Sequence, residues 1–410
     1  MGVTPAASPA GRSTGPRWVR RCRVPFAGRP KAAAGAAHPA APAALLLVLA
    51  AAAAAAASAA AGAGAVWTSD APTPQQLATV ASLSDSSRLF VPDGQFLAPL
   101  LVPRVPGTAG NEKVRAFIAD HFRKLDWEVE VDKFTGPTPV GDVEFANLIV
   151  TKSPAARRRL VLAAHYDSKH LPAGEFIGAT DSAVPCAILL DLAYTLNDLL
   201  DANAADRTLQ MIFFDGEEAF RFWTATDSTY GSRHLAAKWG STFVLPVDDP
   251  ECPPESLLDK IDVFILLDLL GASDPSLPNM QSLTTPYYQA LKETESSLAA
   301  AGLVVLHASQ IGNSSATGVP LGSGAENGRY KAIFNDSPSD SISDDHLPFM
   351  ERGVPIVHLI NYPFPPVWHK LTDNADAIDP VAVYNLNLIF RAFLARYFRL
   401  EPTTREPSTS

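Results

Sequence analysis

Carboxylate and imidazole side chains are spread along this 410-residue chain in an order that could build a zinc site. Asp181, Glu218 and His369 would supply the three protein ligands with which a catalytic zinc site keeps its fourth position open. Glu217 precedes one of these ligands, and neighbouring residues at a strand end point in different directions. It could therefore face a substrate as general base beside the metal. With Asp268 as a further carboxylate, these residue types predict a zinc enzyme.

The pair Glu217-Glu218 also has a simpler explanation, because acidic residues on a loop are usually solvated surface charge. Its context argues against that explanation. The pair follows the uninterrupted apolar run 211–214 almost directly, so its carboxylates begin at the edge of a core. An unpaired charge is costly there.

Apolar runs of β-strand length end just before these side chains. In an α/β protein the carboxyl ends of the strands present the chemistry, so four strand ends are expected to converge on one cleft. The runs are 159–163, 208–214, 261–267 and 355–360, and they lead into His165-Tyr166-Asp167, Asp215-Gly216-Glu217-Glu218, Asp268 and a proline-rich stretch with Trp368 and His369.

Helical patterns alternate with these runs. Residues 111–127 place Val114, Ile118 and Phe122 on one face, and 185–200 and 380–397 are two further predicted helices. The alternation predicts an α/β fold with a central mixed, mostly parallel sheet flanked by helices. Residues 73–402 are enough for one large catalytic domain of this kind.

A second metal position is open by spacing alone. The ligand order of two-zinc aminopeptidases is His-x-Asp after a strand, a further Asp, a Glu pair, another Asp and a distant His. This chain has the same order, beginning with His165 and Asp167. His165 would be the additional ligand. One zinc and two zincs are both compatible with the spacing.

Six longer blocks run in order across roughly residues 75–400 and carry a more specific likeness. They resemble the animal-type glutaminyl-peptide cyclotransferases, whose fold is that of the zinc aminopeptidases. The blocks are His165-Tyr166-Asp167-Ser168-Lys169, Gly178-Ala179-Thr180-Asp181-Ser182-Ala183-Val184-Pro185-Cys186, Phe214-Asp215-Gly216-Glu217-Glu218-Ala219-Phe220 with Trp223 and Tyr230-Gly231-Ser232-Arg233-His234-Leu235, Leu267-Asp268-Leu269-Leu270-Gly271-Ala272, Asp344-Asp345-His346-Leu347-Pro348-Phe349, and Pro363-Phe364-Pro365-Pro366-Val367-Trp368-His369.

The resemblance implies one zinc ion per chain and a specific reaction. Zinc would be held by Asp181, Glu218 and His369, with Glu217 as proton shuttle and Asp268 as a second catalytic carboxylate, hydrogen-bonded near it. The reaction would be cyclisation of an amino-terminal glutamine to pyroglutamate with loss of ammonia. The family also implies a supporting network of Ser182, Asp268, Asp344 and His358, and a pocket lined by Trp223, Ile342, Phe364 and Trp368. Without the family, His358 in its apolar run would be taken as a satisfied core histidine.

The chain departs from the family in two places. Ala164 stands where relatives carry a cysteine that pairs with the one after Val184-Pro185, so Cys186 is expected to lack that disulfide. Pairing of Cys186 with Cys252 stays open. Ser343 stands where relatives carry Gln, and the preceding segment 312–341 matches the family poorly.

The amino terminus differs in kind from the remainder. Residues 1–42 carry seven Arg and Lys and no acidic residue, which predicts a disordered basic tail, and 43–66 is uncharged and rich in Ala and Leu. About twenty apolar residues span a bilayer, and the basic flank places the amino terminus in the cytosol. We expect a signal anchor of a single-pass type II Golgi membrane protein, like the Golgi-anchored form of the family. Cleavage at Ala-x-Ala sites near 58–65 would give a secreted protein instead. Residues 403–410 are a short tail.

Charge limits the partners. The seven cations of the tail belong to a chain of net charge −10, so the remaining residues carry −17. An acidic domain of this kind is a poor nucleic-acid binder and suits peptide and protein substrates with amino-terminal Gln, or Glu as a second substrate. Asn313 and Asn335 lie in glycosylation sequons, in keeping with a lumenal domain. A two-zinc aminopeptidase and a catalytically silent ectodomain remain as rivals.

Overall fold

The computed structural model describes residues 70–90, 93–202, 206–245, 253–311, 330–337 and 341–400. The expected tails 1–42 and 403–410, the expected anchor 43–66, Cys252, Asn313 and most of segment 312–341 lie outside them. The chain divides into two units. The first comprises Met1–Ala63 and Val244–Glu255. The two-residue strands β5 (Phe243–Val244) and β6 (Glu255–Ser256), which pair with each other, lie where the chain passes from one unit to the other. The second comprises Gly64–Phe243 and Ser256–Ser410 and contains the helices and the six-stranded sheet.

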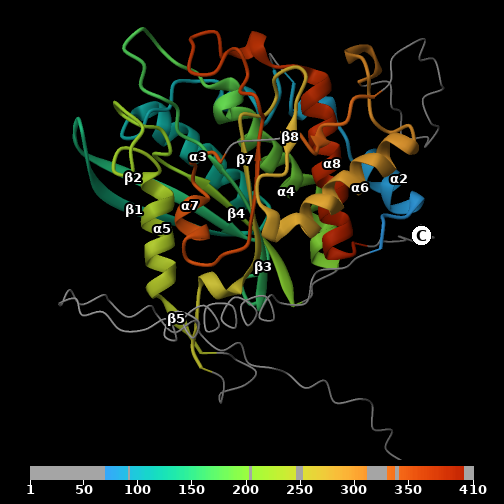
Figure 1. Ribbon diagram of the computed structural model, residues 1–410, viewed down its shortest axis with the longest axis horizontal. Helices are drawn as coiled ribbons and strands as arrows, with labels where there is room; N and C mark the ends of the chain where they lie inside the picture. Colours follow the sequence, from blue (N-terminus) through green and yellow to red (C-terminus); the bar gives the residue numbers. More distant parts are fainter. Residues whose placement is uncertain are drawn as a thin grey trace, which may run out of the picture. The chain divides into compact units, whose positions relative to one another are not determined.

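A six-stranded sheet forms the centre of the second unit (Figure 1). Strands β4, β3, β7 and β10 pair in parallel, whereas β1 and β2 form an antiparallel hairpin that joins the sheet through β2 and β4. Only β2 therefore runs against the others, which confirms the predicted mixed, mostly parallel sheet. In sheet order the strands are β1 (Glu128–Thr138), β2 (Gly141–Thr151), β4 (Arg207–Phe214), β3 (Arg158–His165), β7 (Ile261–Asp268) and β10 (Ile356–Ile360).

The register brings the carboxyl ends of the parallel strands to one level. His165 pairs with Phe214, and Ile360 pairs with Asp268. From β3 the chain crosses to β4 on one side, and from β7 it crosses to β10 on the other, so the connections diverge between β3 and β7. Ligand sites of open α/β sheets lie at such a switch point, outside the carboxyl ends of the strands.

Side-chain alternation along the strands creates two apolar faces. On β3, Leu160, Leu162 and Ala164 join one buried cluster, while Val161 and Ala163 join the other. The larger cluster packs against α2 (Pro74–Ser82), α3 (Ala109–Lys124), α4 (Val184–Ala202), α6 (Thr285–Ala300) and α8 (Pro380–Phe398), and the smaller against α5 (Tyr230–Ser241) and α7 (Leu347–Met350). Helices therefore cover both faces, as the alternating pattern predicted.

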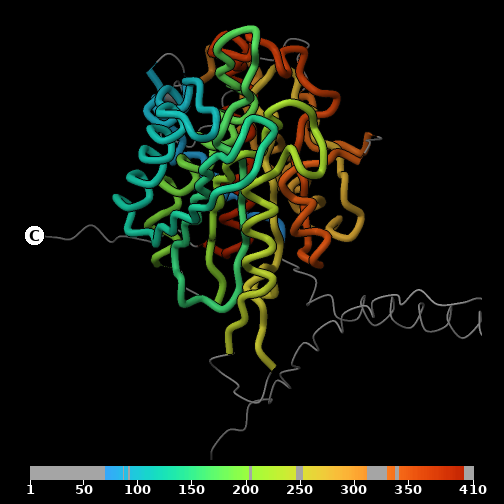
Figure 2. Tube along the Cα trace, turned by 90° about the vertical axis from the view of Figure 1, so that its left-hand side faces the viewer, coloured from blue at the N-terminus to red at the C-terminus, as the bar shows by residue number. Residues whose placement is uncertain are grey.

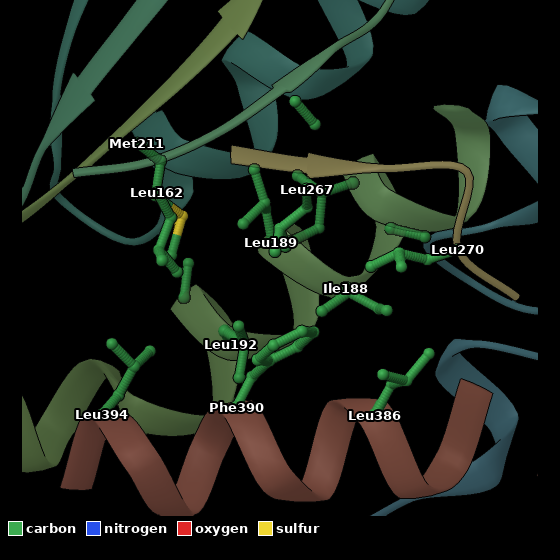
Figure 3. Close-up of a cluster of buried hydrophobic side chains, with 14 of the residues drawn as sticks. Leu162, Ile188, Leu189, Leu192, Met211, Leu267, Leu270, Leu386, Phe390 and Leu394 are labelled. Carbon is green, nitrogen blue, oxygen red and sulfur yellow. The ribbon is translucent and has the colours of Figure 1, made fainter. Parts of the chain in front are cut away.

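Helix α4 lies between the sheet and α8. Figure 3 shows Ile188, Leu189 and Leu192 of α4 between Leu162 and Met211 of the sheet on one side and α8 on the other. By length and composition, one helix in the described part of the chain could cross a membrane, and it is this one with its preceding turn, Ala179–Ala202. Because 72% of its most apolar window is buried in the protein, its place in the core accounts for its hydropathy.

The helices begin where capping residues place them. Thr108 accepts the backbone N–H of Asn111 at the start of α3, and Asp379 accepts those of Val381 and Ala382 ahead of α8. The predicted helices 111–127, 185–200 and 380–397 are thus present with ends shifted by three residues or fewer. The remaining short elements are η1 (Ser86–Arg88), η2 (Ala98–Leu100), η3 (Ala179–Ala183), η4 (Leu258–Lys260), η5 (Ser282–Thr284), η6 (Ala308–Gln310), η7 (Ala375–Ala377), β8 (Leu277–Pro278) and β9 (Phe334–Asn335).

Candidate metal centre

Three loops at the carboxyl edge of the sheet bring a carboxylate, a second carboxylate and an imidazole together. Asp181 lies in turn η3 ahead of α4, Glu218 follows β4, and His369 lies in the loop after β10. His369 Nε2 is 3.4 Å from Asp181 Oδ2 and 3.2 Å from Glu218 Oε1. In Figure 2 the green segment before α4 and the red segment after β10 lie side by side at the upper end of the domain. These are the residues that the sequence predicted as ligands.

The donor set fits a zinc ion. In a tetrahedral site with bonds of about 2.0–2.1 Å, neighbouring ligand atoms lie about 3.3 Å apart. The two spacings around His369 Nε2 match that value. Asp181 Oδ2 and Glu218 Oε1 are moreover buried and lack any hydrogen-bond partner. Because unpartnered buried carboxylate oxygens are costly, their convergence on one imidazole nitrogen is best explained by a shared cation.

The second oxygen of each carboxylate has a different partner. Glu218 Oε2 lies 2.9 Å from Lys169 Nζ, and Asp181 Oδ1 lies 3.1 Å from His165 Nε2. Burial opposes ionisation of Glu218, but His369 and Lys169 outweigh it and lower its pKa. Burial and the nearby charge of Glu218 raise the pKa of Asp181. Each carboxylate is thus held on one side by the protein and left open on the other.

Glu217 stands beside the triad as a buried acid. Only 6% of it is exposed, and burial, with Asp344 and Glu218 nearby, raises its pKa well above the usual value, against the opposing effect of His165. Asp167 holds the backbone of Glu217 and Glu218, because its two carboxylate oxygens accept their N–H groups, each at 3.2 Å. A buried acid of this kind holds its proton more readily than a solvated one.

The turn after β4 requires glycine ahead of the pair. Gly216 has φ 71°, a left-handed conformation, and a Cβ there would lie 2.4 Å from Phe145 Cε1. A residue with a side chain at this position would have to displace the buried Phe145 ring or shift the backbone that leads to Glu217. The sequence Asp215-Gly216-Glu217-Glu218 therefore fixes the direction in which both carboxylates leave the strand.

A second group of potential ligands lies next to the first. His165 Nε2 is 3.4 Å from Asp268 Oδ1, in addition to its contact with Asp181. Asp268 also accepts hydrogen bonds from the Ser182 hydroxyl and from the Leu269 backbone N–H. Burial opposes the charge of His165, but its bonds to Asp167, Asp181 and Asp268 raise its pKa well above the usual value. In the structure this group is internally hydrogen-bonded, unlike the triad.

Asp344 and His358 form a further pair, with His358 Nε2 2.7 Å from Asp344 Oδ2. Asp344 also accepts the backbone N–H of Asp345, and burial raises its pKa against the effect of His358. Among the described residues, no hydrogen bond joins Glu217 to Asp344 or to Asp268. Asp344 therefore acts on Glu217 through its charge, and the expected hydrogen-bonded position of Asp268 beside Glu217 is not seen in the described part of the chain.

Aromatic rings form a wall beside the triad. The indole of Trp368 stacks on the His369 ring with centroids 4.1 Å apart, and Phe364 meets that indole edge-on at 4.8 Å. Trp368 and Trp223 are 39% and 40% exposed. Trp223 makes no ring contact with either residue in the described part of the chain, and Ile342 is half-buried. Two of the four predicted pocket residues are thus in mutual contact at the site.

The supporting contacts of several residues were not predicted from the sequence. Asp167 was considered there as part of a two-zinc ligand order and Lys169 as part of a family block. Nothing in their spacing indicates that Lys169 contacts Glu218 or that Asp167 accepts the backbone N–H groups of the Glu pair. Arg104 and Asp373 support the Asp181 turn and carry no sequence signal at all. Cys186 is a buried free thiol, which donates to the His165 carbonyl oxygen at 3.2 Å.

Known proteins are similar to this chain in sequence and in fold. A profile of peptidase family M28 matches residues 147–394. The glutaminyl-peptide cyclotransferase-like protein of Mus musculus is 40% identical over 332 residues, 79% of each chain. The glutaminyl-peptide cyclotransferase of Drosophila melanogaster is 43% identical over 319 residues, 77% of this chain and 82% of the relative. The crystal structure of Macrostomum lignano glutaminyl cyclase, 37% identical, superposes with a TM-score of 0.65 and covers 82% of this chain and 98% of that one.

Proposed function

Since this chain belongs to the glutaminyl-peptide cyclotransferases of peptidase family M28, we propose that it cyclises the amino-terminal glutamine of peptides and proteins to pyroglutamate with release of ammonia. The observation that carries the proposal is the triad of Asp181, Glu218 and His369 beside the buried acid Glu217. The two orphaned carboxylate oxygens converge on His369 Nε2, and the neighbouring acid retains its proton more readily than a solvated one.

Asp181, Glu218 and His369 would hold one zinc ion per chain. When bound, zinc supplies a Lewis acid that polarises the side-chain carbonyl of the substrate glutamine. Lys169 would keep Glu218 charged and oriented through its 2.9 Å contact with Oε2. Stacking of Trp368 on His369 would fix the plane of the imidazole ring.

Glu217 would move the proton. The substrate's α-amine attacks its own side-chain carbonyl carbon, so a C–N bond forms and closes the five-membered ring. Glu217 takes a proton from that amine and delivers it to the departing amide nitrogen, which leaves as ammonia while Glu217 is restored. A carboxylate with a pKa raised by burial suits both halves of this transfer. The substrate supplies the nucleophile, so no catalytic Ser or Cys is required.

The surrounding residues would shape the environment of this transfer. Asp344, which His358 holds by a hydrogen bond, contributes to the raised pKa of Glu217, and Asp268, which accepts from the Ser182 hydroxyl, would be a second carboxylate near the transfer. Trp223, Ile342, Phe364 and Trp368 would enclose the glutamine side chain and exclude water, since water at the metal would favour hydrolysis to glutamate.

A second candidate, a two-zinc aminopeptidase, has one specific observation in its favour. His165, Asp181 and Asp268 place ligand atoms within 4.8 Å of one another, as the triad does. Ser182 and His165, however, already satisfy Asp268 and Asp181 Oδ1 in this group, whereas the triad leaves two oxygens unpartnered.

We place the enzyme in the Golgi membrane as a single-pass type II glycoprotein, with basic tail 1–42 in the cytosol, anchor 43–66 and catalytic domain 73–402 in the lumen. The seven cations before an uncharged apolar stretch support this orientation. The alternative is a secreted enzyme cleaved near 58–65. The partners would be peptides and proteins with an amino-terminal Gln, with Glu-initiated peptides as slower substrates. Nucleic acid would not be a partner.

Mass spectrometry of a Gln-initiated peptide incubated with the purified chain tests the reaction. Loss of ammonia with every residue retained, abolished by a chelator and restored by zinc, is the expected result. Loss of the whole first residue would make the chain an aminopeptidase. A peptide that stays unchanged although the protein has bound metal would indicate a catalytically silent ectodomain.

A further inference from the structure

Two ligand-bearing loops are joined by one buried carboxylate outside the triad. Asp373 follows His369 by four residues, and its Oδ1 accepts both the backbone N–H of Thr180 at 2.9 Å and the Thr180 hydroxyl at 3.0 Å. The Asp373 carbonyl oxygen also accepts the backbone N–H of Ala179 at 3.1 Å. Thr180 directly precedes Asp181. Three hydrogen bonds therefore connect the loop of one ligand to the turn of another.

Solvent is excluded from this connection. Asp373 and Thr180 are both 0% exposed, so their hydrogen bonds form in a low-dielectric interior where they are stronger than at the surface. The Asp373 backbone N–H in turn donates to the Lys370 carbonyl at 2.9 Å, which closes a turn directly after His369. The His369 loop and the Asp181 turn are thereby joined through one buried residue.

Arg104 holds the same turn through its carbonyl groups. Its guanidinium donates to the Gly178 carbonyl at 2.9 Å, to the Asp181 carbonyl at 3.4 Å and to the Ile177 carbonyl. Its Nε donates to the Tyr166 carbonyl at 2.7 Å, and the side chain is 1% exposed. The Asp181 turn is therefore held on its N–H side by Asp373 and on its carbonyl side by a buried cation.

We propose that Asp373 and Arg104 are positioning residues, which hold the Asp181 turn and the His369 loop in the ligand arrangement before a metal ion binds. Neither touches the reacting atoms. Their effect is on metal affinity, because ligands that are already fixed at bonding distance lose less conformational entropy on binding. This inference rests on the proposed metal triad but not on the cyclisation reaction.

The test compares zinc affinities of full-length variants stripped of metal. Affinity is measured by competition with a chromophoric chelator, and the visible absorption of bound Co(II) reports the coordination geometry. Asp373→Ala is expected to weaken zinc binding about 10- to 100-fold and to alter the Co(II) spectrum. Thr180→Val, which loses one hydrogen bond and keeps the shape, is expected to weaken it about two- to tenfold. Thr180→Ser keeps the hydroxyl and should restore wild-type affinity.

Glu295 provides a matched control. Its buried carboxylate accepts three hydrogen bonds, from the backbone N–H groups of Ile333 and Phe334 and from the Tyr330 hydroxyl, and so fastens a loop to α6 in the same manner. Glu295→Ala should lower the thermal midpoint of the metal-free chain as Asp373→Ala does, and should leave zinc affinity unchanged.

The proposal is overturned if Asp373→Ala binds zinc as tightly as the wild type, or if Glu295→Ala weakens binding equally. If Asp373→Ala does not fold, equal affinities of Thr180→Val and Thr180→Ser overturn it, and the expected difference supports it. A wild-type chain that binds zinc but does not cyclise peptides would remove the proposed function alone. Zinc affinity that is indifferent to His369→Ala would remove both.

Discussion

Lys169 Nζ lies 2.9 Å from Oε2 of Glu218, the oxygen that faces away from His369. Lys169→Met would leave that oxygen without its cation in a buried site, and a buried charge that loses its partner is strongly disfavoured. We expect zinc affinity to fall about tenfold, the lower bound for loss of an outer partner of a metal ligand. Lys169→Arg keeps the charge, so its zinc affinity should fall less than that of Lys169→Met. Equal affinities of Lys169→Met and the wild type, in chelator competition, would show that Lys169 does not act through Glu218.

Glu217 can be separated from the metal ligands by an isosteric change. Glu217→Gln keeps the volume but cannot accept the proton of the substrate amine, so turnover should fall about 10²- to 10⁴-fold. Zinc content should remain that of the wild type, because Glu217 Oε atoms are not part of the triad. Turnover by ammonia release and zinc by atomic emission are the two measurements. A fully active Glu217→Gln enzyme would end the proton-shuttle assignment.

The number of metal ions distinguishes the two ligand groups. His369→Ala should lose zinc and activity together, because its Nε2 lies 3.4 Å and 3.2 Å from the two orphaned oxygens and would be the nitrogen ligand. His165→Ala should retain the single zinc of the wild type, since His165 hydrogen-bonds to Asp181 through the other carboxylate oxygen. Metal analysis after dialysis checks both. Two zinc ions in the wild type, one of them lost in His165→Ala, would favour the aminopeptidase.

The parts of the site that follow strands were predictable, whereas the parts that hold its backbone were not. Asp181, Glu218 and His369 could be selected because ligand chemistry restricts a zinc site to a few residue types, and apolar runs of strand length placed Glu218 and His369 at one sheet edge. Arg104 binds backbone carbonyl groups, and Asp373 binds a backbone N–H and the Thr180 hydroxyl. Every residue offers a carbonyl, and every residue except proline offers an N–H. Which polar side chain reaches them depends on tertiary packing of distant segments, so no local pattern marks it.

The helix ends show the same limit on a smaller scale. The apolar face of α3 indicated the helix, but its start at Ala109 follows from the Thr108 cap, which the periodicity of Val114, Ile118 and Phe122 does not contain. Likewise, the apolar run 355–360 predicted β10, while the hydrogen bond between His358 and Asp344 requires a segment that precedes the strand by a turn and α7. Periodicity reports burial, and polar partners must be found in the folded chain.

His121 on α3 should make stability depend on pH away from the metal site. Burial lowers its pKa to about 4, although Leu190 and Asp191 act in the opposite direction and Lys124 acts with burial. Its Nε2 lies 3.0 Å from the Leu190 carbonyl oxygen, and the ring packs edge-on against Phe96. The neutral imidazole is therefore the form that fits the core.

The lowered pKa of His121 determines the direction in which stability changes with pH. Between pH 6.5 and 4 the unfolded chain binds a proton at His121 that the folded chain does not, so stability falls as the pH is lowered through this window. The loss from this residue amounts to about 3 kcal/mol. His121→Gln keeps a donor for the Leu190 carbonyl and cannot titrate, so its thermal midpoint should fall less than that of the wild type between pH 6.5 and 4. Both chains should be measured with a chelator present, because protonation of the metal ligands would add a separate pH dependence. Identical slopes for the two chains would mean that His121 is charged or solvated in the folded protein.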